Sequence, residues 1–190
     1  MLSSITPLGQ RGRGMSWSRT VIGFWIGSIA AGAVIFSVSG LIGTALGLDS
    51  FNPWFGTVVI ATAAILDLAR IKPLGPKRQV DEDWLGSYRD WVVGFGYGAQ
   101  LGLGFVTIIP TWGTWALFLV GASLGLQVAT IMGVAFGIGR SLLLFSTRTI
   151  SSPTKLSETM RRFAGAESRA RWIAMAGYAV VILTVGFNVV

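Results

Sequence analysis

Long apolar stretches alternate with short polar segments along this chain of 190 residues. Several of the apolar stretches reach about 20 residues or more with few charges, the length that an α-helix needs to cross the hydrocarbon core of a bilayer. The run from 91 to 146 is too long for a single crossing. The pattern predicts an all-α fold, a polytopic transmembrane helix bundle that forms one domain.

The basic residues set the expected topology. All 15 Lys and Arg lie in the N-terminal tail, in 70–89 or in 140–171. Segments rich in Lys and Arg favour the cytoplasmic side, so an even number of crossings is expected between the second and third segments. This predicts five spans and a cytoplasmic N-terminus. The expected spans are about 20–48, 54–71, 91–125, 127–147 and 172–190, with a tail at 1–19 and cytoplasmic loops at 72–90 and 148–171.

The stretch 105–115, FVTIIPTWGTW, has two interpretations. A surface turn at Pro110 would end a span there, and Trp112 and Trp115 favour this because tryptophan is common at membrane interfaces. A turn near 125–127 would instead make 91–125 one crossing, with a break inside the helix at Pro110 and Gly113. The residues alone leave both alternatives open.

Composition narrows the chemistry. The chain is 52% hydrophobic and 12% charged, its mean hydropathy is +0.66, and it contains neither Cys nor His. It therefore has no thiol couple and no imidazole ligand for a metal or haem, so we expect no cofactor and no metal site. Soluble-enzyme motifs are absent from the sequence, and we expect no enzymatic activity. The net charge of +7 is explained by topology and anionic lipid, not by nucleic acid.

Glycine supplies 26 residues, many of them four positions apart. Rows of this kind let helix backbones approach closely in lipid, where dispersion contacts drive helix packing. We therefore expect close helix packing at Gly94, Gly98, Gly102, Gly133 and Gly137.

A few polar residues fall within or near the expected spans. Asp67 and Arg70 are three positions apart and can pair on one helix face. Ionisable groups inside a membrane often mark a substrate or ion path, and Asp67, Arg140, Thr111 and Gln100 are the candidates for such a path. Asp67 is also a candidate partner for Arg140 if the helix break is real. Hydrogen bonds between helices and an ion pair at the membrane surface are the alternative roles.

The segment 151–171 has an amphipathic pattern. Ser152 followed by Pro153 is typical of a helix start, and Leu156, Met160 and Phe163 recur at helical spacing. We expect either a short interfacial helix on an anionic leaflet or a solvated loop. The basic residues that would face lipid are Lys155, Arg161 and Arg162.

The stretch 96–126, GYGAQLGLGFVTIIPTWGTWALFLVGASLGL, resembles the fourth helix of the cytochrome c biogenesis protein transmembrane family, the CcdA/DsbD membrane domain. The stretch 129–144, ATIMGVAFGIGRSLLL, is similar to its fifth helix. The resemblance favours a break at Pro110, with Thr111 where the family has a reactive cysteine. The family's first helix has no counterpart here. A threonine hydroxyl cannot cycle through a disulfide, so the resemblance implies the fold without the electron transfer.

These observations lead to two hypotheses. The first is a non-redox accessory or structural subunit of the bacterial cytoplasmic (inner) membrane, linked to redox-protein maturation or a membrane complex. Its expected partners are membrane lipids and other integral membrane subunits. The alternative is a small-molecule or ion transporter, in which the broken helix lines the path.

Overall fold

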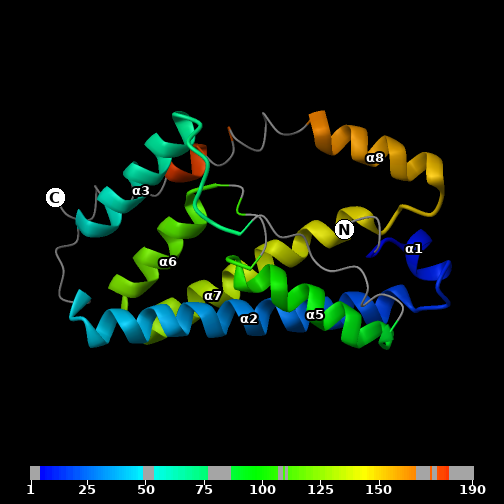
Figure 1. Ribbon diagram of the computed structural model, residues 1–190, viewed down its shortest axis with the longest axis horizontal. Coiled ribbons are helices and arrows are strands. Elements are labelled where there is room, and N and C mark those ends of the chain that lie inside the picture. The colour runs from blue at the N-terminus through cyan, green and yellow to red at the C-terminus, as the bar shows by residue number, and fades with distance from the viewer. Residues whose placement is uncertain are drawn as a thin grey trace.

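The computed structural model describes residues 5–48, 54–76, 87–106, 109, 111–165, 172 and 175–179. All regular elements within these residues are helices, which confirms the all-α prediction (Figure 1). They are α1 (Pro7–Arg11), α2 (Trp17–Ala45), α3 (Trp54–Leu68), α5 (Asp90–Leu103), α6 (Gly113–Ser123), α7 (Gly125–Leu142), the 3₁₀ helix η3 (Leu143–Thr147) and α8 (Pro153–Gly165). Residues 175–179 are also helical.

Two helices of the described residues, α2 and α7, are long and apolar enough to cross a membrane. The described helices therefore do not confirm the prediction of five spans. The reason lies in their lengths, because α3 has only 15 residues and the expected span 91–125 is divided into α5 and α6. Most of the expected last span, 172–190, lies outside the described residues.

Helix α5 packs along the N-terminal half of α2. The two helices run parallel, because Gly94 lies against Thr20 and Gly98, four residues later, lies against Phe24. A Cβ atom at either glycine would overlap the carbonyl group that it faces. The short distance between the two backbones therefore depends on residues without a side chain.

Helix α7 packs on the other part of α2 and runs in the opposite direction. Gly133 lies against Gly32, and Gly137 lies against Ser28, whose Oγ donates a hydrogen bond to the Gly137 carbonyl at 3.0 Å. Ser28 also faces Gly102 of α5. The region around Ser28 is therefore where three helices meet.

Helix α6 continues the direction of α5 along α2. Ser39 Oγ donates to the Phe118 carbonyl at 2.6 Å, and Ala122 lies against Gly43 near the end of α2. Helix α5 ends beside the middle part of α2, where Gly102 faces Ser28, whereas α6 begins beside the end of α3, where Trp112 contacts Asp67 (Figure 1). The chain reverses only later, at Gly125, which has a φ of +76° and leads into α7. Helices α5 and α6 are therefore two halves of one passage along the bundle, although Pro110 itself lies outside the described residues.

The N-terminal residues close one end of this bundle. The Leu8 N–H donates to the Ile150 carbonyl at 3.2 Å, and the buried Gln10 side chain accepts from Thr20 at 3.0 Å. Asp90, at the start of α5, accepts from the Ser16 N–H at 3.2 Å. These contacts bring the start of α5, just after Arg89, to the end of the bundle that holds the N-terminal tail and Ile150. The other described part of the second basic segment lies elsewhere, because Ile71 and Leu74 contact the residues before and within α6.

Helix α8 lies apart from α2 and α5 (Figure 1). Its basic residues Lys155, Arg161 and Arg162 are exposed, and Arg162 forms an ion pair with Glu158. The start at Pro153 matches the sequence signal. Its placement on a membrane leaflet stays a prediction.

Candidate functional site: the break between α5 and α6

The break begins where α5 ends. Gly104 caps this helix in the left-handed region, with a φ of +72°, and its N–H donates to the Leu101 carbonyl at 3.1 Å. Only glycine adopts this conformation without strain. Helix α6 starts at Gly113, so its first N–H groups and the last carbonyl groups of α5 need partners from elsewhere in the molecule.

Asp67, near the end of α3, supplies the partner at the α6 side. Its Oδ1 accepts from the Trp112 backbone N–H at 3.0 Å, and its Oδ2 accepts from the Tyr178 hydroxyl at 2.8 Å. The N-terminus of a helix carries a partial positive charge, so a carboxylate is stabilised there. One side chain thereby joins α3, the break and the segment 175–179.

Tyr178 brings two further groups of the break into the same cluster. The hydroxyls of Tyr178 and Thr111 both lie close to Gly113. A Cβ at Gly113 would lie 2.5 Å from the Tyr178 hydroxyl oxygen and 3.3 Å from Thr111 Oγ1, so a larger residue would force one of them to move. Thr111, Gly113 and Asp67 therefore form one polar cluster around Tyr178.

The first part of the expected loop 72–90 packs against the break. Trp112 Nε1 donates to the Ile71 carbonyl at 2.8 Å, and Trp115 Nε1 donates to the Leu74 carbonyl at 2.8 Å. The two indoles that favoured a surface turn in the sequence are thus bonded within the chain. Residues 71–76, which follow α3, therefore contact the break through these two hydrogen bonds.

Arg140 lies at the other end of the break, away from the Asp67 cluster. Its Nη1 donates to the Leu101 carbonyl at 2.9 Å, and its guanidinium lies over the Phe136 ring at 5.2 Å. Asp67 and Arg140 therefore contact different residues, and the expected pair between them is not formed. Each residue lies at a different end of the break, because α3 and α7 approach it from different sides.

Asp67 and Arg70 were also expected to share a helix face. Helix α3 ends at Leu68, and Arg70 has a left-handed φ of 57°, so the helical relation between the two positions is lost. The Asp67 carboxylate faces Trp112 and Tyr178 instead.

Gln100 is half-buried in the last turn of α5, next to the residue whose carbonyl binds Arg140.

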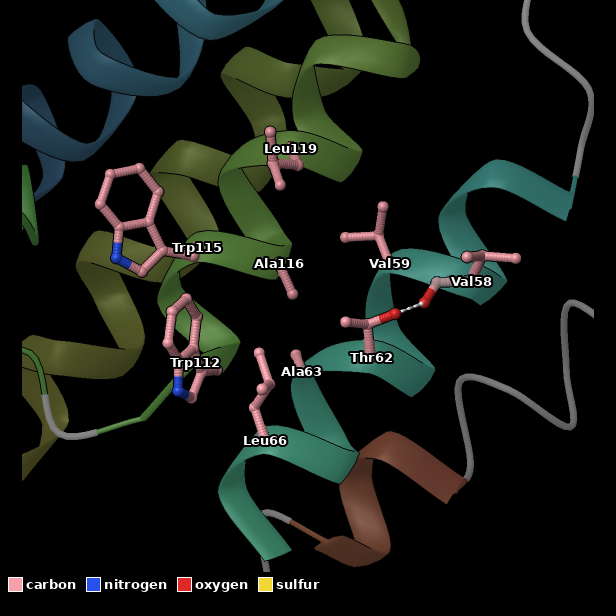
Figure 2. Close-up of a pocket in the computed structure, with 9 residues that line it drawn as sticks. All are labelled: Val58, Val59, Thr62, Ala63, Leu66, Trp112, Trp115, Ala116 and Leu119. Atoms are coloured by element: carbon pink, nitrogen blue, oxygen red, sulfur yellow. Dashed lines mark hydrogen bonds between the residues drawn. The ribbon is translucent and has the colours of Figure 1, made fainter. Parts of the chain in front are cut away.

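An apolar groove of about 200 Å³ lies between α3 and α6, beside the polar cluster. Figure 2 shows the side chains of the two helices facing one another across it. Its one hydroxyl, on Thr62, donates to the Val58 carbonyl within α3, so the groove offers mainly apolar contacts. The lining residues are Val58, Val59, Thr62, Ala63, Leu66, Trp112, Trp115, Ala116 and Leu119.

The described residues contain no group of three or more His, Cys, Asp or Glu side chains that could hold a metal ion. Among the described residues at the break, the groups that can form polar contacts include the Asp67 carboxylate, the Tyr178 phenol, the Thr111 hydroxyl and the Arg140 guanidinium. Tyr178 is the member that the sequence reasoning missed. Its signal was present, because it is the one hydrogen-bonding aromatic residue of the last predicted span after Trp172.

The comparisons with known proteins give one relative. The Methylamine utilization protein MauF of Paracoccus versutus is 29% identical over 152 residues, which cover 74% of this chain and 54% of that protein. The chain thus spans about half the length of this relative. No protein-family model matches the chain, and no solved structure matches it.

Proposed function

We propose that this protein is a five-span subunit of the bacterial cytoplasmic membrane, with a non-redox accessory role in the maturation or assembly of a redox protein. The observation that supports it best is that the break in the α5–α6 passage is closed by the chain's own groups. Both Asp67 oxygens and the Arg140 guanidinium are bonded to parts of the same chain. Such a break acts as a structural joint.

The outer surface supports the membrane part of the proposal. Helices α2 and α7 expose large apolar side chains, among them Val34 at 59% and Ile131 at 68%. Exposure of this kind along two helices of sufficient length suits contact with lipid. The end with the N-terminal tail, Arg89 and Arg148 would face the cytoplasm.

Two features favour the accessory role. The relative's name connects that protein with methylamine utilization, and we extend a supporting role in such a process to this chain. The resemblance to the CcdA/DsbD family is the feature that points to redox-protein maturation. Because the chain has no Cys, it would support such a process without carrying thiol electrons itself.

Purification from native membranes tests the accessory role. The tagged protein, extracted in mild detergent and cross-linked before mass spectrometry, should bring down a second integral membrane protein in constant proportion. A comparison with an unrelated tagged membrane protein of similar size removes background binding. Recovery of this chain alone, with and without cross-linking, would contradict the proposal.

The interruption between α5 and α6 is the observation that favours the alternative, a transporter. Methylammonium is the probe suggested by the name of the relative. In vesicles reconstituted with the protein, a transporter would take up labelled methylammonium, and Asp67→Asn would abolish the uptake. If the break has only a structural role, vesicles with the unchanged protein and vesicles with Asp67→Asn should both show the same low flux as protein-free vesicles.

A further inference from the structure

The two ends of the break each meet a side chain of opposite charge. Helix α5 ends with carbonyl groups, and the Leu101 carbonyl accepts from Arg140 at 2.9 Å. Helix α6 begins with N–H groups, and the N–H of its N-cap residue Trp112 donates to Asp67 at 3.0 Å. The helix dipole is negative at the first end and positive at the second, so each charge is placed where it is stabilised.

Broken helices inside a membrane leave backbone groups that have no water to bind. In transporters the ends of such half-helices bind anionic and cationic solutes. Here the carboxylate of Asp67 and the guanidinium of Arg140 take these two places. The Phe136 ring covers the guanidinium, and Tyr178 completes the hydrogen bonding of the carboxylate.

We propose that Asp67 and Arg140 are positioning residues, two built-in countercharges that fix the end of α5 and the start of α6 on either side of the break. Asp67 comes from α3 and Arg140 from α7, so each acts on its own end of the break. This inference goes beyond the accessory role and does not depend on which partner the protein serves.

Chemical rescue tests the role of the carboxylate. Asp67→Ala removes it and leaves the Trp112 N–H and the Tyr178 hydroxyl facing an empty space. Thermal unfolding of the full-length protein in detergent should then show a midpoint several degrees below that of the unchanged protein. Sodium formate should recover at least half of this loss, whereas sodium chloride at equal concentration should recover little.

Two control variants make the test specific. Arg140→Ala, which damages the other end of the break, should lose stability without a gain from formate beyond that from chloride. Asp67→Ala combined with Tyr178→Phe should lose the rescue, because one of the two donors is missing. Equal effects of formate and chloride on Asp67→Ala, or equal rescue of Arg140→Ala, would overturn the proposal.

A second cavity variant covers the case in which Asp67→Ala does not fold. Asp67→Ser keeps a small polar group but cannot reach both donors, so formate should still raise its unfolding midpoint above that in chloride. Asp67→Asn serves as the filled-site control, because its amide occupies the space and should block the rescue. Equal formate response of Asp67→Ser and Asp67→Asn would count against a carboxylate site.

Discussion

The Tyr178 hydroxyl donates a hydrogen bond of 2.8 Å to Asp67 Oδ2, and this contact links residues 111 positions apart. It connects the helical segment near the C-terminus with the end of α3. Through the second oxygen of the carboxylate, it also reaches the start of α6. The contact therefore joins three segments at the point where the α5–α6 passage is interrupted.

Tyr178→Phe should destabilise the protein by about 1–3 kcal/mol, because the half-buried Asp67 carboxylate loses one of its two donors. The unfolding midpoint of the purified protein measures this loss. A double-mutant cycle with Asp67→Asn isolates the contact, since its coupling energy excludes packing of the ring. Additive effects of the two substitutions would show that the contact contributes nothing.

Gly98→Ala should destabilise the protein by about 1–3 kcal/mol, because the added Cβ would overlap the backbone of Phe24 and force α5 away from α2. Gly139 is the matched control, since a Cβ there meets nothing within 4 Å. Gly139→Ala should leave stability unchanged or raise it by up to about 1 kcal/mol through better helix propensity. Thermal unfolding of both variants in the same detergent compares them, and equal losses would contradict close packing at Gly98.

Arg140→Met should cost about 1–3 kcal/mol, because the Leu101 carbonyl at the end of α5 loses its charged donor while the apolar bulk is largely kept. Arg161→Met on the exposed face of α8 is the control and should change stability by less than about 0.5 kcal/mol. Hydrogen exchange provides a local measurement, with faster exchange expected in the last turn of α5 only for Arg140→Met. Unchanged exchange there would argue against the capping role.

The absence of cysteine from the natural chain allows the topology to be mapped with single introduced thiols. Leu46 is 68% exposed at one end of α2, and Thr149 is exposed near the opposite end of the bundle. An impermeant maleimide added to intact spheroplasts should label Leu46→Cys but reach Thr149→Cys only after the membrane is opened. Labelling of both variants from outside would refute the proposed orientation.

Much of the helical fold could be predicted because it depends on local patterns. Apolar runs predicted the regions of α2, α3 and α7, and glycines four positions apart lie at the contacts of α5 and α7 with α2. The helix ends near Asp67 could not be predicted in this way. Arg70 leaves the helix with a left-handed φ of 57°, which removes the local pairing that three-residue spacing suggested.

The polar cluster also combines residues that could be predicted from the sequence with a contact that could not. Asp67, Thr111 and Gly113 were identified as polar or flexible positions in an apolar chain, whereas the hydroxyl of Tyr178 could be noticed in the sequence but not assigned to Asp67. A hydrogen bond between segments far apart in the chain depends on how helices pack, and no periodic pattern encodes it.

The amino-acid sequence by itself determined the helical class, the absence of thiols and the positions of the basic segments, but it left open whether the stretch before Trp112 is a surface turn or a helix break. These properties follow from composition and from the spacing of neighbouring residues. Only the tertiary structure decided that α5 and α6 follow one another along α2, and that Asp67 and Arg140 serve opposite ends of the break. The physical reason is that backbone groups freed by a broken helix are satisfied by whichever side chains packing brings near.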